Sequence, residues 1–195
     1  MPKGTNRRTS LELYHINPQD VKKSQAWFDE QVAKLSTKKI TPNRLMYGDG
    51  GSTLTSRLMP GKMYFFYYSA KHQDTLPYWD QFPLVIPFTK HKDGFTGLNF
   101  HYLGYRERML LIKELDRIMG TGFGETRKLE MVWGLVNSMS KLGTARACVK
   151  RYLTSHVKSP YCEVPYSSWY TAMMMPVQRF VGATKEHVWS ESRNI

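Results

Sequence analysis

The stretch MPGKMYFFYYSAKHQDTLPYWDQFPLVIPFTKHKDGFTGLNFHYL, residues 59–103, decides the fold of this chain. It opens on a Pro-Gly turn and continues at residues 63–68 as an unbroken apolar and aromatic run, a composition that strands favour. A second apolar run at residues 82–88 contains Pro83 and Pro87, which cannot donate to a sheet ladder. These prolines predict an edge strand, a strand end or a bulge.

The dipeptide Asp93-Gly94 is the strongest hairpin signal of the sequence. A third apolar run, residues 95–103, follows it directly. Three strands joined by short turns predict a small antiparallel sheet or an SH3-like barrel.

Beyond Gly104 the apolar residues change to a helical period. They fall on one face over residues 105–119 and again over 125–141, and a third helix is expected over 146–157. A short helix before Pro176 and an N-terminal helix over residues 18–36 complete the pattern. The fold class predicted is α+β, with a small antiparallel SH3-like barrel or sheet packed against a C-terminal helical part and with extended N- and C-terminal arms.

The expected organisation is one compact domain with arms. Its parts are a basic N-terminal arm and helix (1–58), a small β module (59–104), a helical part (105–176) and a C-terminal tail (177–195).

The formal net charge of +12 is unevenly distributed along the chain. Residues 1–44 carry nine basic and four acidic residues, residues 45–104 five and four, and residues 105–195 fourteen and eight. A nearly neutral β module with basic flanks fits a polyanion such as nucleic acid, an acidic protein surface, or simply a basic solvated surface. Within the third predicted helix, the spacing of Arg146, Lys150 and Arg151 places them on one side. The candidate nucleic-acid-binding residues are Lys141, Arg146, Lys150, Arg151 and Lys158.

The sequence does not predict an enzyme, a metal site or a cofactor. The six histidines form no HxH or HExxH pair, and Cys148 and Cys162 match no zinc spacing. The glycine-rich residues 48–53 lack the P-loop spacing and are expected to be a flexible loop. A Cys/His site formed by His156 and Cys162 is the only catalytic alternative, and it has no orienting third group. No catalytic residue and no small-molecule substrate are therefore assigned.

The sequence also predicts no membrane-spanning segment and no signal peptide. No apolar run approaches the roughly 18–20 residues that span a bilayer, so no membrane partner is expected. Because the N-terminus lacks a signal-peptide pattern, the two cysteines are expected to be free thiols in a reducing compartment.

Four segments resemble a family of small virion-associated proteins of contractile-tailed bacteriophages. They are MYFFYY (63–68), LPYWDQFPL (76–84), DGFTGLNFHYL (93–103) and the pattern YLxSHVxS…W…A…P…F…VWxxSR over residues 152–193. From its first to its last motif, residues 63 to 193, the match spans about two thirds of the chain. The motifs are structural and contain no catalytic constellation.

The resemblance implies a non-enzymatic virion structural protein, a tail, baseplate or neck component that joins neighbouring subunits. The alternative that it implies is a protein that binds and protects double-stranded DNA ends in the phage particle. The expected partners are other virion proteins in a symmetric assembly and, under the alternative, double-stranded DNA. The protein would reside in the virion after assembly in the host cytoplasm. The residues expected to contact partner proteins are Tyr78, Trp79, Phe82, Trp189 and Ile195.

Overall fold

The computed structural model describes residues 53–174 and 178–193. Residues 1–52, which include most of the predicted N-terminal arm and helix and of the glycine-rich loop, lie outside these residues, as does Ile195. Within them the chain forms an α+β fold with two antiparallel sheets, which confirms the predicted class.

The larger sheet has six strands in the order β1-β7-β2-β4-β5-β6, and every neighbouring pair is antiparallel. The smaller sheet pairs two short strands, β3 and β8. The strands of the larger sheet are β1 (Thr53–Thr55), β2 (Met63–Phe65), β4 (Leu84–His91), β5 (Gly94–Asn99), β6 (Val149–Leu153) and β7 (Tyr161–Val164). Those of the smaller sheet are β3 (Trp79–Asp80) and β8 (Phe180–Val181).

The predicted hairpin is confirmed. His91 pairs with Gly94 at the turn, and the register shifts between Pro87 and Thr89, where the sequence predicts a strand irregularity. Gly61 of the predicted Pro-Gly turn has a φ of +86°, which only glycine adopts without strain.

The SH3-like barrel is not formed. Among the described residues the larger sheet is open, with β1 and β6 at its two edges. Strands β6 and β7 come from the part of the chain expected to be helical, and they extend the sheet beyond the three strands of the opening stretch. A wider, open sheet replaces the small barrel because these later strands pair with β5, β2 and β1.

The predicted third helix over residues 146–157 is also wrong. This segment forms a 3-10 turn, η3 (Gly143–Cys148), then strand β6, then a second 3-10 turn, η4 (Thr154–His156). Val149, Tyr152 and Leu153 have a spacing that fits a helix, but their β-branched and aromatic side chains also suit a strand. Pairing with β5 decides between the two, because it buries Tyr152 against Phe95 with stacked rings 5.2 Å apart.

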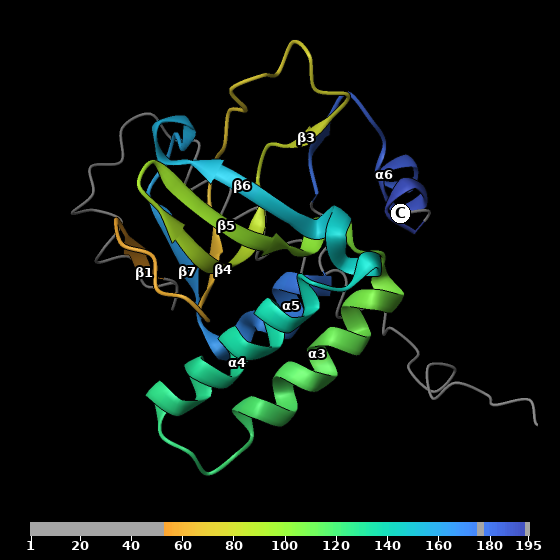
Figure 1. The fold of residues 1–195 in the computed structure, drawn as a ribbon. Coiled ribbons are helices and arrows are strands. Elements are labelled where there is room, and N and C mark those ends of the chain that lie inside the picture. Colours follow the sequence, from red (N-terminus) through yellow and green to blue (C-terminus); the bar gives the residue numbers. More distant parts are fainter. Residues whose placement is uncertain (1–52, 175–177, 194–195) are drawn as a thin grey trace, which may run out of the picture.

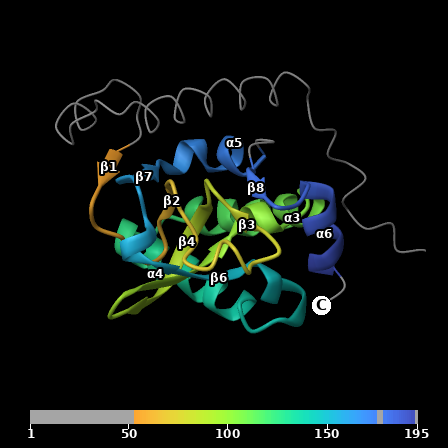
Figure 2. The same cartoon turned by 90° about the horizontal axis from the view of Figure 1, so that it is seen from above.

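Three of the described helices agree with the sequence, whereas the C-terminal segment, predicted to be an extended arm, forms a strand and a helix. Helices α3 (Tyr105–Met119) and α4 (Glu125–Met139) match the predicted ranges closely, and α5 (Trp169–Met174) follows a 3-10 turn, η5 (Tyr166–Ser168). The expected C-terminal tail contains β8 and a fourth helix, α6 (Lys185–Arg193). Figure 1 shows α3, α4 and α5 on one face of the larger sheet. Figures 1 and 2 place α6 at the end of the molecule opposite to β1.

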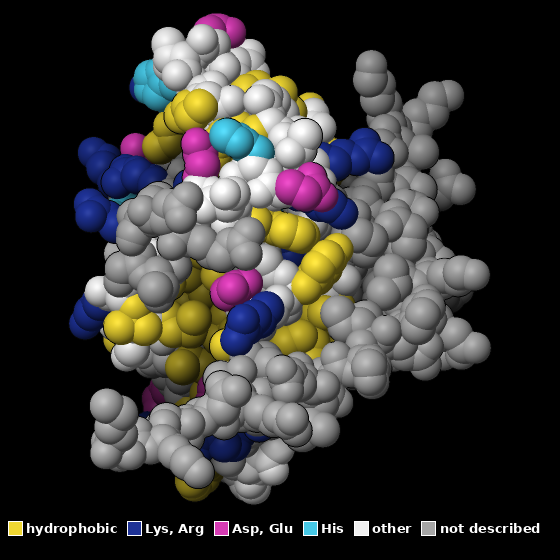
Figure 3. Space-filling model, turned by 90° about the vertical axis from the view of Figure 1, so that its right-hand side faces the viewer, with side chains coloured by type: hydrophobic (Ala, Val, Ile, Leu, Met, Phe, Trp, Pro, Cys, Tyr) yellow, Lys and Arg dark blue, Asp and Glu magenta, His cyan; other side chains and the backbone are white. Residues whose placement is uncertain are grey.

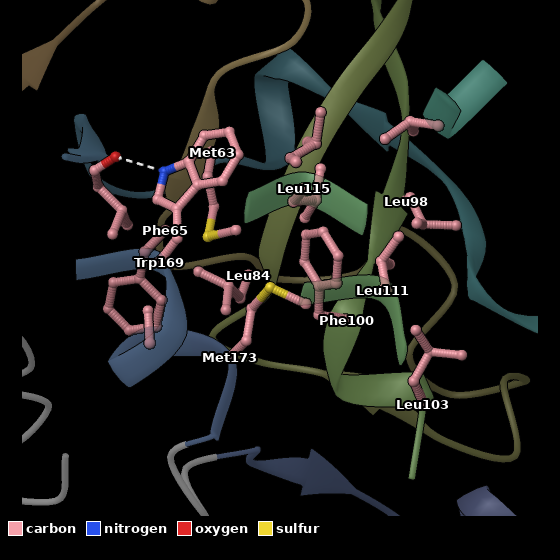
Figure 4. Packing of buried hydrophobic residues seen from close by; sticks show 14 of the residues in the cluster. Met63, Phe65, Leu84, Leu98, Phe100, Leu103, Leu111, Leu115, Trp169 and Met173 are labelled. Atoms are coloured by element: carbon pink, nitrogen blue, oxygen red, sulfur yellow. Dashed lines mark hydrogen bonds between the residues drawn. The ribbon is translucent and has the colours of Figure 1, made fainter. Parts of the chain in front are cut away.

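Alternation along the strands gives the larger sheet two different faces. The face toward α3, α4 and α5, here called the helix-covered face, carries aliphatic, methionine and phenylalanine side chains (Figure 4). The opposite face, here called the loop-covered face, carries mainly aromatic side chains and is packed by loop residues such as Leu58 and Val157. The buried residues of the loop-covered face are Tyr64, Phe66, Tyr68, Ala70, Val85, Phe95, Tyr152 and Tyr161.

A buried arginine joins the helices to the end of the sheet. Arg108 of α3 is fully buried and donates hydrogen bonds to the carbonyl oxygens of Leu103, His101 and Met173 at 2.8, 3.2 and 3.0 Å. Its guanidinium also lies 5.4 Å from the ring of Trp189 in α6. Burial lowers the pKa of Arg108 to about 10. This contact set fixes the position of α6, which in turn supports the region around β3.

Candidate nucleic-acid interface

Two hollows flank the aromatic layer of the loop-covered face. The first, here called the aromatic pocket, has a volume of about 350 Å³ and lies between the segment 68–80 and strand β6. Five rings and four basic or histidine side chains line it: Tyr68, Tyr78, Trp79, Tyr102, Tyr152, Lys71, His72, Lys150 and Arg151.

The basic side chains of the aromatic pocket have different surroundings. Lys150 is half-buried with its Nζ 4.0 Å from the centre of the Tyr102 ring, and burial lowers its pKa. Arg151 is exposed and forms a 2.5 Å ion pair with Asp93 at the hairpin turn. Lys71 is exposed in the loop before β3. The pocket therefore has one cation inside and two at its rim.

A buried polar network supports the inner end of the aromatic pocket. Asp80 is only 3% exposed, and its Oδ2 accepts a hydrogen bond from Asn99 at 3.0 Å and lies 2.7 Å from Nδ1 of His101. Asn99 also donates to the hydroxyl of Tyr152 at 3.0 Å. Burial raises the pKa of Tyr152 well above its usual value. His101 is thus a hydrogen-bonded core histidine, and this network fixes strand ends and rings in place.

The small sheet and α6 close the aromatic pocket on one side. The hydroxyl of Tyr78 donates to Oε2 of Glu191 in α6 at 2.6 Å. Burial, with a smaller effect from Glu191, raises the pKa of Tyr78 to about 12. Its ring also packs edge-on against Phe180 of β8, at 6.2 Å. The expected C-terminal tail therefore helps to position a wall of this pocket.

The second hollow, here called the hairpin pocket, has a volume of about 410 Å³. It lies between the segment that follows β1 and the β4–β5 hairpin, and basic side chains line it at Arg57, Lys90 and Lys92. His91 also lines it and contacts Thr96 across the hairpin at 2.8 Å. None of the described residues that line this pocket is acidic.

The structure brings together two of the five predicted nucleic-acid-binding residues. Lys150 and Arg151 line the aromatic pocket. Lys141 follows α4, Arg146 lies in η3, and Lys158 follows η4; all three are exposed, and none of them lines either hollow. Because residues 149–153 form a strand, the single basic helix face does not exist.

The residues predicted to contact partner proteins are also dispersed. Tyr78 and Trp79 line the aromatic pocket. Phe82 is only 8% exposed and stacks on Phe65 at 5.9 Å, so the expectation of an exposed aromatic there is wrong. Trp189 is half-buried and donates to the carbonyl oxygen of His101 at 2.8 Å.

The sequence prediction missed four basic residues that line the two hollows: Arg57, Lys71, Lys90 and Lys92. They lie in residues 45–104, where basic and acidic residues nearly balance, so the net charge of this segment does not indicate them. Figure 3 looks at the side that carries α6 and shows Lys and Arg side chains gathered at the left edge of this view, beside hydrophobic ones.

The described residues contain no group of three His, Cys, Asp or Glu side chains that could hold a metal ion. Both cysteines in this part of the chain are buried thiols that form no disulfide, and burial raises the pKa of the Cys148 thiol to about 12. Of the helices described, none has the length and apolar character needed to cross a membrane.

A family model described as the phage T4 terminal DNA protecting protein matches residues 15–193. The chain belongs to this family. No curated protein and no solved structure matches it. The match confirms the resemblance to proteins of contractile-tailed phages that the motifs suggest. It agrees with the DNA-end-protecting alternative better than with a tail, baseplate or neck component.

Proposed function

We propose that this phage protein binds the ends of double-stranded DNA and shields them through its loop-covered face. The observation that carries the proposal is the pair of hollows on this face, which are lined by Arg57, Lys71, Lys90, Lys92, Lys150 and Arg151. The family match supports DNA as the polyanion, because the protein that names the family protects terminal DNA.

The charges near these basic residues favour an anionic partner. Asp93 is the exposed acidic side chain paired with Arg151, and Asp80 is buried in its own hydrogen-bond network. An exposed ion pair of this kind is worth about 0–1 kcal/mol, so a phosphate can replace Asp93 at little cost. If about five phosphates are neutralised, the logarithm of affinity should fall with the logarithm of salt with a slope of about −4.5.

The protein would act by covering the DNA end and would catalyse no reaction there. Asp80, the acidic residue that lines the aromatic pocket, and its partner His101 are at most 3% exposed and bonded to each other. Their burial supports a structural role for them, and a general acid or base must reach its substrate. The protein would cover an end and deny access to nucleases.

A second candidate function, contact with other virion proteins, is supported by an apolar hollow on the helical side. Met59 and Trp133 are 49% and 41% exposed and line a hollow of about 360 Å³ together with Pro60 and Leu129 of α4. Exposed apolar side chains of this size are typical of protein contact surfaces. We propose that this groove, with the C-terminal segment, holds the protein in the particle among neighbouring subunits.

The test of end binding compares two duplexes of equal length and sequence, one with open blunt ends and one with both ends closed by hairpin loops. The protein should bind the open duplex more tightly and protect it from an exonuclease. Equal affinity for both duplexes would contradict end binding and leave only backbone binding. The same comparison at two salt concentrations measures the number of phosphate contacts.

A further inference from the structure

We infer that the aromatic pocket holds a single unpaired nucleotide from the DNA end, stacked on Trp79. This inference rests on the proposed function and assigns the ligand of one of its two hollows. The remaining duplex would lie outside this pocket, with its phosphates on the basic rim.

The size of the pocket selects one nucleotide. Its volume is about 350 Å³, near the lower limit of small-ligand sites. The major groove of B-DNA alone is about 12 Å wide, so the duplex itself cannot enter such a hollow. One nucleotide separated from its partner is the part of a DNA end that this volume fits.

The rings that line the pocket differ in what they can offer a base. The Tyr102 ring is covered by the Lys150 ammonium, and Tyr78 is bonded to Glu191 and packed on Phe180. Trp79 is half-buried and packs against the aromatic cluster of the loop-covered face, and within the part of the chain that the structure describes its indole makes no side-chain hydrogen bond. Its indole is the surface left for stacking, and stacking on an aromatic ring tolerates every base.

The cations of the pocket stand where the phosphates of that nucleotide would lie. Lys71 and Arg151 are exposed at the rim, and Lys150 lies inside against Tyr102. Asp80 is too deeply buried to read the edge of a base, since its side chain is 1% exposed. The pocket therefore predicts binding that requires a base but does not select its identity.

This arrangement also explains a preference for ends. A nucleotide at the end of a duplex loses one stacked neighbour when it leaves the helix, whereas an internal nucleotide loses two and distorts the backbone on both sides. An overhanging nucleotide loses no pairing. The pocket is thus occupied at least cost by a terminal nucleotide.

The experiment uses the full chain and duplexes that are closed by a hairpin loop at one end. The other end carries a one-nucleotide overhang, 3′ or 5′, which has either a base or an abasic sugar. For at least one polarity, the base should raise affinity about tenfold over the abasic overhang. A 2-aminopurine at the overhang should lose fluorescence on binding. Trp79→Leu should bring the ratio of affinities to about one, whereas Trp79→Phe, which keeps a ring, should retain most of it.

The matched control is Phe123→Leu, which removes a 54% exposed ring from the loop between α3 and α4 and should leave the ratio unchanged. Equal affinity for base-bearing and abasic overhangs of both polarities overturns the inference. If open ends are still preferred to closed ends in that case, the proposed function stands. If the protein binds neither open nor closed duplexes, both the inference and the proposed function fall.

Discussion

The two faces of the six-stranded sheet are buried equally well but are built from different chemistry. On the helix-covered face, Ile86, Leu98 and Phe100 are fully buried against helical side chains (Figure 4). On the loop-covered face, Phe66 is fully buried among rings and meets Tyr152 and Tyr161 edge-on at 5.3 Å. Edge-to-face packing is a favourable geometry for aromatic pairs.

The tyrosine hydroxyls explain why loops can cover one face. The hydroxyl of Tyr64 accepts a hydrogen bond from the backbone N–H of Met59 at 3.0 Å, and that of Tyr68 accepts one from the N–H of Leu153. Each ring thus contributes apolar area to the core and a polar atom that fixes a loop backbone. A face covered in this way keeps hollows between its loops, and those hollows carry the basic side chains. Stability and binding are therefore assigned to opposite faces.

The largest expected effect is a loss of stability without a loss of DNA affinity, caused by a substitution on the helix-covered face. Phe100→Ala should lower the free energy of unfolding by about 3–5 kcal/mol, because it removes a fully buried ring and leaves a cavity. Urea denaturation measures this change. DNA affinity per folded molecule should stay the same, and a large loss of affinity in the folded variant would show that the two faces are coupled.

On the loop-covered face we expect the opposite result, a loss of DNA affinity without a loss of stability. Lys71→Glu combined with Arg151→Glu should reduce affinity for open DNA ends by at least about tenfold and lower the salt slope by about two. Because both side chains are exposed, the free energy of unfolding should change by no more than about 0.5 kcal/mol. Fluorescence anisotropy at several salt concentrations measures the affinity and the slope.

The control for this pair is Arg117→Glu on α3, an arginine whose side chain is 78% exposed on the helical side. It changes the net charge of the protein in the same direction without altering either hollow. If Arg117→Glu weakens binding as much, per charge, as the pair does, the interface is not where we place it.

Alkaline pH should destabilise the loop-covered face through its buried tyrosines. Burial raises the pKa of Tyr64 to about 12 and also raises that of Tyr152 well above its usual value, whereas unfolding restores a value near 10. The unfolded state then binds fewer protons above pH 10, so stability should fall as pH rises through this range. The slope should be up to about 1.4 kcal/mol per pH unit for each such tyrosine.

Denaturation at a series of pH values between neutrality and pH 11 tests this expectation. Tyr64→Phe should make the decline shallower, at a cost of about 1 kcal/mol at neutral pH for the lost hydrogen bond with Met59. An unchanged slope in Tyr64→Phe would show that the hydroxyl is not protected by the fold.

The smallest expected effect is the reactivity of the cysteines on the helix-covered face. Cys148 and Cys162 are at most 1% exposed, and burial raises the pKa of Cys148 to about 12. Since the thiolate is the reactive species, a thiol reagent at pH 8 should label neither residue in the native protein. Labelling should appear only as denaturant unfolds the chain, and fast labelling of the native state would contradict the packing of this face.

Much of the fold could be predicted because local signals and tertiary packing agree. The turn at Asp93-Gly94 and the apolar stripes of α3 and α4 appear where the sequence indicates them. The strand β6 could not be predicted, because the spacing of Val149, Tyr152 and Leu153 fits a helix and only pairing with β5 excludes one. The sequence predicts a barrel because nothing in it shows that β6 pairs with β5, or β7 with β1 and β2, and these pairings make the sheet wide and open.

The candidate site was predicted only in part, because net charge does not show where charges lie. Residues 45–104 contain five basic residues, and four of them, Arg57, Lys71, Lys90 and Lys92, line the two hollows. The fifth, Lys62, pairs with Glu163 at 2.7 Å. Of the four acidic residues of the segment, Asp80 is buried, Asp93 is paired with Arg151, Asp74 is exposed but lines neither hollow, and Asp49 lies outside the described residues. The near-neutral sum therefore does not show that the two hollows are basic.

The most direct test of the account is to map which part of the protein touches a DNA end. A blunt duplex with a photoreactive 5-iodouracil at its terminal position would be cross-linked to the full chain, and the attached peptide identified by mass spectrometry. The account predicts attachment within residues 68–80 or on β6, around Trp79 and Tyr152. Attachment confined to α3 and α4 would contradict the assignment of DNA binding to the loop-covered face.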